Sequence, residues 1–68
     1  MRRKNLKIFR IEQDLTQSDM AIEIGCSRDA YSAIESGNRD PSYGFMENLQ
    51  KAFNIPDERM WALLEREK

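Results

Sequence analysis

The chain has 68 residues, enough for one small domain, and we expect residues 1–68 to form a single unit. A domain of this size buries only roughly 60% of the surface that its unfolded chain exposes, so we expect modest stability unless oligomerisation adds to it. The net charge is −1, the single cysteine excludes an internal disulfide, and without His a metal site would depend on carboxylates alone, so we expect no metal and no cofactor.

The first expected helix covers about residues 3–13, where apolar residues recur at helical spacing (Leu6, Ile8, Phe9). Leu15 then docks the turn that follows. A second helix begins after Thr16, whose hydroxyl is a typical N-cap, with Asp19 three residues on as a short version of the capping-box acid. Gly25 ends this helix, because glycine readily takes the positive φ of a sharp turn.

A third helix begins directly after this glycine, with Ser27 as its cap and Gly37 as its end. Two short helices joined so closely are expected to cross steeply, which is the organisation of a helix-turn-helix over about residues 16–36. The outer face of the second of them is then free of any role in the core. Its residues are polar or small: Arg28, Asp29, Ser32 and Ala33.

Two more helices complete the chain after a polar loop over residues 38–41. Ser42 caps the fourth helix, Asn54 suits its left-handed end, and its expected apolar stripe is Phe45, Met46, Leu49, Ala52 and Phe53. Residues 56–57 open the fifth helix, which runs through Leu64. Since no strand pattern is present, the sequence predicts an all-α, compact five-helix domain.

Four short segments follow one another in this chain: Leu-Thr-Gln at 15–17, Ile-Gly-Cys-Ser-Arg at 24–28, Ile-Glu-Ser-Gly-Asn-Arg at 34–39 and Asp-Pro-Ser at 40–42. Their order and spacing resemble the Cro/C1-type (XRE) helix-turn-helix family of phage-repressor DNA-binding domains, over about residues 5–61. The resemblance implies a lambda repressor-like fold and a sequence-specific transcriptional regulator. Its expected partner is double-stranded DNA.

In helix-turn-helix proteins the second helix of the motif enters the major groove, so its N-terminal residues are expected to read bases. The Arg28 fork matches the O6 and N7 acceptors of guanine, although a phosphate contact or a solvated side chain is the alternative. Asp29 can accept a hydrogen bond from cytosine N4, or it can only orient Arg28. Ser32 can donate to a base or a phosphate, and Ala33 can meet a thymine methyl.

The resemblance also implies a set of phosphate contacts, which position the protein without specifying sequence. Gln17 lies in the first turn of the motif's first helix, where the helix dipole favours an anion, although a plain surface glutamine is the alternative. Ser27 is a cap that can also donate to a phosphate. Asn38 and Arg39 follow Gly37, where the loop of this family approaches the DNA backbone.

Three further residues are interpreted as structural. The resemblance implies that Arg10 pairs with Glu35 and thereby fixes the recognition helix on the core. Cys26 occupies a place where the family commonly has a small aliphatic residue, so we interpret it as a packed hydrophobe rather than a redox switch.

Charge is unevenly distributed, because residues 1–10 carry five cations and no acid (Arg2, Arg3, Lys4, Lys7, Arg10). The remaining 58 residues therefore sum to −6, since the total is −1. The basic end is expected near the duplex backbone, or else is an ordinary solvated face. It is not followed by an apolar segment, and no apolar run is long enough to span a bilayer, so we expect a cytoplasmic protein without a membrane partner.

A repressor of this kind is expected to bind a pseudo-palindromic operator as a homodimer, with half-sites about one helical turn apart. The last helix is the expected dimer contact through Met60, Trp61 and Leu64, the alternative being that Trp61 closes the core. A competing hypothesis is an antitoxin-like or anti-repressor module, whose acidic surface (Asp19, Glu23, Asp29) meets a basic protein. An enzyme is not expected, because the lone cysteine has no His partner and no phosphate-cradling glycine loop is present.

Overall fold

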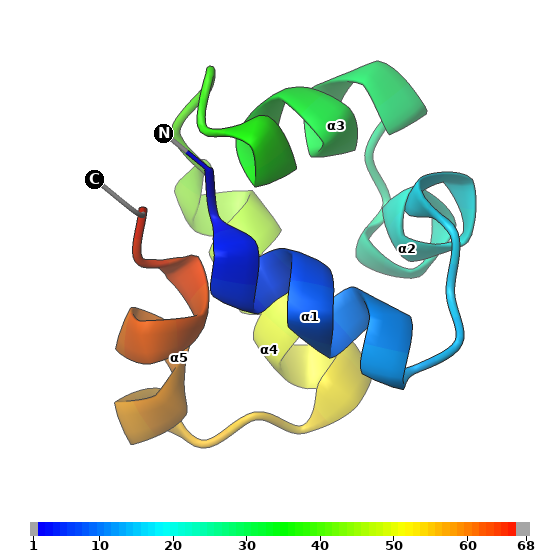
Figure 1. Cartoon of the computed structure of the whole chain (residues 1–68). Helices are drawn as coiled ribbons and strands as arrows, with labels where there is room; N and C mark the ends of the chain where they lie inside the picture. The colour runs from blue at the N-terminus through cyan, green and yellow to red at the C-terminus, as the bar shows by residue number, and fades with distance from the viewer. Residues whose placement is uncertain (1, 67–68) are drawn as a thin grey trace.

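A computed structural model describes residues 2–66, and five helices follow one another along this part of the chain (Figure 1). They are α1 (Lys4–Glu12), α2 (Gln17–Ile24), α3 (Arg28–Ser36), α4 (Tyr43–Phe53) and α5 (Asp57–Leu64). Residues 2–66 contain no strand, which confirms the all-α prediction. None of the helices within this range is both long enough and apolar enough to cross a membrane.

The helix boundaries follow from local side-chain chemistry. α2, α3 and α4 each begin after a hydroxyl residue whose Oγ accepts a hydrogen bond at 3.1 Å from a backbone N–H three residues on: Thr16, Ser27 and Ser42. The Asp19 carboxylate accepts a hydrogen bond from the Thr16 N–H at 3.1 Å and so completes a capping box. The same helices end in left-handed residues, Gly25 (φ 86°), Gly37 (φ 87°) and Asn54 (φ 54°).

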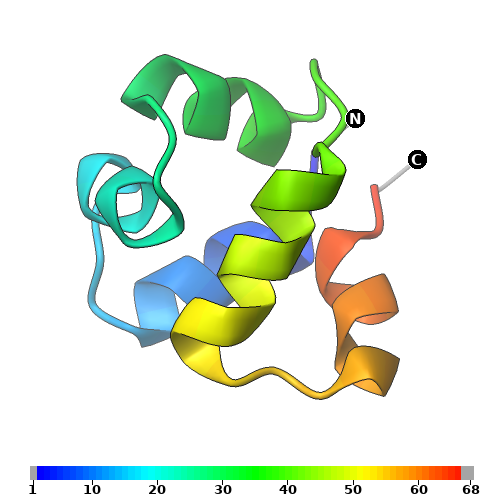
Figure 2. The ribbon, with the colours of Figure 1, turned by 180° about the vertical axis from the view of Figure 1, so that it is seen from behind.

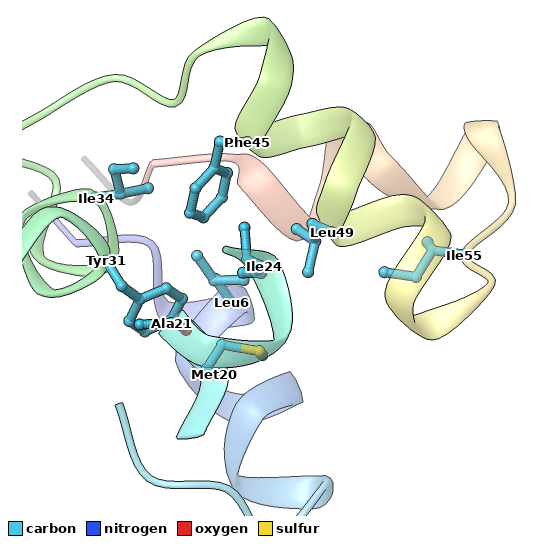
Figure 3. Close-up of a cluster of buried hydrophobic side chains, with 9 residues drawn as sticks. All are labelled: Leu6, Met20, Ala21, Ile24, Tyr31, Ile34, Phe45, Leu49 and Ile55. Carbon is cyan, nitrogen blue, oxygen red and sulfur yellow. The ribbon is translucent and has the colours of Figure 1, made fainter. Parts of the chain in front are cut away.

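The helices enclose one core. In Figure 1, α1 lies in front and α4 behind, and Figure 2 shows the reverse view with α4 in front. α2 lies beside α3, and α5 lies next to α1. Side chains from the first four helices converge there (Figure 3), together with Ile55 from the α4–α5 connection. Tyr31, Leu6, Met20 and Leu49 are fully buried. The core therefore holds α3 by the Tyr31 and Ile34 side of the helix.

Three expectations about packing are wrong. Ala52, assigned to the apolar stripe of the fourth helix, is exposed. The alternative in which Trp61 closes the core is also wrong, because 85% of this residue is exposed. On α5 the residues that pack against the core are Met60, Leu63 and Leu64, which share one face at spacings of three and four. Trp61 follows Met60 by one position and is not among the residues packed against the core.

Arg3 also differs from expectation, because it is not one of the exposed cations of the basic end. Its side chain is buried, with 3% of the residue exposed, and α1 begins one residue later than Arg3, at Lys4. The chain before α1 lies against the end of α3, where the Arg3 N–H donates to Glu35 O at 2.9 Å. Because the Arg3 side chain is buried, the basic end presents fewer free cations than the sequence indicates.

Candidate nucleic-acid interface

The outer face of α3 carries the four residues expected to read bases. Arg28 and Asp29 are exposed, and Ser32 and Ala33 are partly exposed. Four ion pairs are found among residues 2–66, and their cations are Arg3, Arg10, Lys51 and Arg66. Asp29 therefore does not orient Arg28 through an ion pair within this part of the chain. Both side chains are available to an external partner.

The start of α2 lies beside α3 and carries Gln17, which is partly exposed. Its Nε2 donates to Glu35 Oε1 at 3.1 Å, a bond that the sequence did not indicate. An amide nitrogen carries two hydrogens, so one remains for another acceptor. The first N–H groups of α2 also lack partners inside the helix, which favours an anion at this end.

Ser27, Asn38 and Arg39 flank α3 at its two ends. The Ser27 Oγ accepts the Ala30 N–H at 3.1 Å, which leaves its hydroxyl hydrogen as a donor. The backbone N–H groups of Asn38 and Arg39 both donate to Ala33 O, at 2.9 and 3.2 Å, and both residues are exposed. The loop is thus tied to α3 through its backbone while its side chains face solvent.

Beneath this surface the structure brings Arg10 and Glu35 together. Arg10 Nε lies 2.8 Å from Glu35 Oε2 and Nη2 lies 3.3 Å from Oε1, while Nη1 donates to Leu15 O at 2.7 Å. The two side chains are 12% and 6% exposed, so the pair is largely shielded from water. It joins α1, the α1–α2 turn and α3.

The electrostatics of this pair favour its ionised form. Burial alone would raise the pKa of Glu35, but the hydrogen bonds from Arg10 and Gln17, the nearby Tyr31 hydroxyl and the Arg10 charge outweigh it and lower that pKa. The hydrogen bond to Glu35 likewise raises the pKa of Arg10. Burial raises the pKa of Tyr31, whose hydroxyl has no partner at hydrogen-bond geometry within residues 2–66. Glu35 is therefore a fixed negative charge on the inner side of α3 at neutral pH.

A groove of about 590 Å³ runs between α1, together with the two residues before it, and the side of α3. Arg2, Lys4 and Lys7 lie on its α1 side, Ser32 and Ser36 on its α3 side, and Gln17 at its end. All three of these cations are exposed. These cations therefore share a groove with Ser32 of the outer face of α3, and Ile8, Ile11 and the buried Glu35 also line it.

A family model described as helix-turn-helix matches residues 6–59, which covers all of α2, α3 and α4. The chain belongs to the Cro/C1-type helix-turn-helix family. This agrees with the two capped helices, the αL glycine between them and the exposed outer face of the second. α2 and α3 are thus the two helices of the motif, and α3 is its recognition helix.

Three curated relatives are similar to this helix-turn-helix domain. An uncharacterized HTH-type transcriptional regulator, YqaE, of Bacillus subtilis is 40% identical over 52 residues, 76% of this chain and 45% of its own. An uncharacterized HTH-type transcriptional regulator of Methanocaldococcus jannaschii is 38% identical over 53 residues, 78% of this chain and 80% of its own. The cryptic phage CTXphi transcriptional repressor RstR of Vibrio cholerae is 33% identical over 51 residues, 75% of this chain and 46% of its own. The matched region thus spans less than half the length of the Bacillus and Vibrio relatives.

The helix-turn-helix domain has a second hollow on its far side, between α4 and α5. Tyr43 is 77% exposed and Trp61 is 85% exposed, and both line this groove of about 660 Å³. Met46, Met60 and Leu64 form its floor, and Glu47, Asp57 and Glu65 lie at its rim. The three residues expected at a dimer contact are therefore not equivalent. Met60 and Leu64 are partly buried, whereas Trp61 is exposed.

Cys26 lies between the two helices of the motif and is partly buried against the core. Burial raises the pKa of its thiol, which keeps the sulfur protonated and poorly nucleophilic at neutral pH. This favours the interpretation of Cys26 as a packed hydrophobe.

Proposed function

We propose that this protein is a sequence-specific transcriptional regulator that inserts α3 into the major groove of double-stranded DNA and represses by occluding polymerase. One observation carries the proposal: the inner side of α3 is fixed by the core and by Arg10, while Arg28 and Asp29 on its outer side are exposed. A recognition helix needs this combination, because base contacts require a rigid helix with free side chains. The repressor role is supported by the likeness to the phage repressor. A DNA partner would place the protein in the cytoplasm.

Base recognition is proposed to come mainly from Arg28. Its guanidinium can donate two hydrogen bonds to guanine O6 and N7, which is worth about 1–3 kcal/mol of discrimination. Asp29 accepts from cytosine N4 and rejects bases that present an acceptor at the same place. Ser32 donates to a base edge or a phosphate, and Ala33 contacts a thymine methyl.

Phosphate contacts are proposed to surround this reading face. The second amide hydrogen of Gln17 and the first backbone N–H groups of α2 donate to one phosphate. Ser27, Asn38 and Arg39 contact the DNA backbone from the two ends of α3. The exposed Arg2, Lys4 and Lys7 supply charge beside the same face. They explain how a chain of net charge −1 can bind a polyanion.

A matched pair of charge reversals tests the DNA-binding proposal. Arg28→Glu should abolish binding to duplex DNA, whereas Arg59→Glu on α5 makes the same change in net charge away from α3 and should leave the affinity within about twofold, as expected for a screened distant charge. Fluorescence anisotropy with labelled duplex at near-physiological salt measures both. Equal losses of affinity in the two variants would mean that binding depends on net charge and not on the face of α3. No binding by the unaltered protein would favour the competing protein-interaction module, although Asp19, one of its three acids, is already engaged in the α2 capping box.

The proposed repressor binds as a homodimer through the α4–α5 groove, with Trp61 of each copy against the other copy's Met60 and Leu64. Two exposed aromatics in one groove are more apolar surface than a monomer of this size needs. The acidic rim brings like charges together, so added salt should strengthen the association.

Sedimentation velocity at tens of micromolar protein tests the dimer. Trp61→Ala should convert the dimer to a monomer, whereas Ile22→Ala, which removes another exposed apolar side chain (76% exposed) from α2, should not. A monomeric unaltered protein, or a dimer that survives Trp61→Ala, would contradict this interface.

A further inference from the structure

One buried cation, Arg3, holds three separate parts of the chain together. Its Nη1 donates to Ile34 O at 2.6 Å and to Arg39 O at 2.9 Å, and its Nε donates to Leu64 O at 3.0 Å. Its Nη2 lies 3.2 Å from the Asp40 carboxylate. The guanidinium therefore links the end of α3, the α3–α4 loop and the end of α5.

The α3–α4 loop is the part that depends most on this residue. Its N–H groups at Asn38 and Arg39 are bonded to Ala33 O, and its carbonyl at Arg39 is bonded to Arg3. The loop backbone is thus held by Ala33 and Arg3, with a longer bond of 3.5 Å from the exposed Arg66 Nη1 to Gly37 O. It belongs to no helix, and its Asn38 and Arg39 side chains are exposed. Because the backbone is held in one place, the Asn38 and Arg39 side chains start from fixed positions beside α3.

We infer that Arg3 is a positioning residue for DNA binding, which sets the backbone of residues 37–40 at a fixed place beside the recognition helix. The inference rests on the proposed function, in which Asn38 and Arg39 contact phosphates. Arginine suits this task because its planar fork donates in several fixed directions at once, whereas a lysine ammonium is a compact point charge on a flexible stem. Arg3 acts through Arg39 and needs no contact with DNA itself.

The first arm of the test needs no DNA. Hydrogen exchange is followed by NMR at the Asn38 and Arg39 amides in the unaltered protein, in Arg3→Lys and in Asn5→Ala. Asn5 is the matched control, because its Nδ2 donates to Ala62 O at 2.9 Å and so ties α1 to α5 without contacting the loop. Arg3→Lys should speed exchange at the two loop amides by roughly tenfold relative to the Leu49 amide in the core, as expected when one charge-assisted hydrogen bond is lost. Asn5→Ala should leave that ratio unchanged.

The second arm measures duplex affinity against salt concentration. The slope of log K against log salt is negative, and Arg3→Lys should reduce its magnitude by about one, the change expected for the loss of one phosphate contact. In the Arg3→Lys background, Arg39→Ala should cause no further loss. Asn5→Ala should keep the slope of the unaltered protein. Unchanged loop exchange in Arg3→Lys, or additive losses in the double variant, would overturn the positioning role.

Two further comparisons keep the result decisive. If Arg3→Lys does not fold, Asp40→Ala removes an exposed carboxylate whose Oδ1 lies 3.2 Å from Arg3 Nη2 and 4.0 Å from Arg66 Nη1. This variant should speed exchange at the same two amides by a smaller factor, and no change there would overturn the inference. If the unaltered protein binds no DNA, the proposed function fails, while the exchange measurement still decides whether Arg3 orders the loop.

Discussion

The two sides of α3 differ in burial and in bonding to the rest of the fold. On the inner side Tyr31, Ile34 and Glu35 are buried, and Glu35 is bonded to Arg10 from α1 and Gln17 from the start of α2. On the outer side Arg28 and Asp29 face solvent. One helix can therefore separate the residues that hold it in the fold from the residues that are free to contact a partner. Changes on the inner side should therefore alter stability, and changes on the outer side should alter specificity.

The largest effect is expected from Glu35→Ala on the inner side. It leaves the Arg10 guanidinium buried without its carboxylate, which typically costs about 3–5 kcal/mol in the free energy of unfolding. Urea denaturation measures this loss. Glu47→Ala is the control, because its pair with Lys51 on α4 is exposed and 3.7 Å long, and should be worth at most about 0.5 kcal/mol. Similar losses in the two variants would remove the distinction between the buried pair and the exposed one.

The same pair predicts how stability depends on pH. Because the folded pKa of Glu35 is held below its ordinary value of 4.5, its contribution is complete above that pH and is lost as pH falls toward the folded pKa. Asp19 acts in the same direction, since its bond to the Thr16 N–H lowers its pKa. Glu35→Gln should flatten the acid limb of a stability profile measured by urea denaturation below about pH 4.5 and leave a residual slope from Asp19. An unchanged profile would mean that the Glu35 charge does not stabilise the fold.

Arg28→Ala on the outer side should change specificity without changing stability. Loss of a bidentate guanine contact should cost about 1–3 kcal/mol on the preferred sequence and much less on sequences that lack that guanine. Competition titrations with single-base variants of a selected site measure the difference. A uniform loss across all sequences would assign Arg28 to a phosphate.

Gln17→Ala should give the smallest effect, an even weakening of about 0.5–1.5 kcal/mol on every sequence, because one hydrogen bond to a phosphate carries no base information. Gln13→Ala, at an exposed glutamine just after α1, is the matched control and should bind as the unaltered protein does. A base-dependent loss for Gln17→Ala would move Gln17 from the phosphate contacts to base readout.

Local chemistry explains how much of the fold could be predicted from the sequence. The caps at Thr16, Ser27 and Ser42 and the αL end at Gly25 depend on neighbours within a few residues, so a single sequence displays them. The Arg10 and Glu35 contact spans 25 positions and was indicated only through the family resemblance.

Two features of the structure depend on long-range packing and were missed. Nothing near Arg3 signals that Ile34, Arg39 and Leu64 would supply carbonyls to it, since they lie 31 to 61 positions away. On α5 the stripe containing Leu63 competes with one containing Trp61, and only the packing of α5 against α1 decides between them. The features that the sequence did not predict are therefore contacts between segments that are far apart in the chain.

The central claim, that the outer face of α3 reads DNA sequence, is tested most directly by selecting binding sites from randomised duplex DNA with the unaltered protein and Arg28→Ala in parallel. We expect the unaltered protein to select a two-fold symmetric site with half-sites about 10 base pairs apart, and Arg28→Ala to lose base preference at one position in each half-site. Enrichment of the same site with the same base preferences by both proteins, or no enrichment by the unaltered protein, would contradict it.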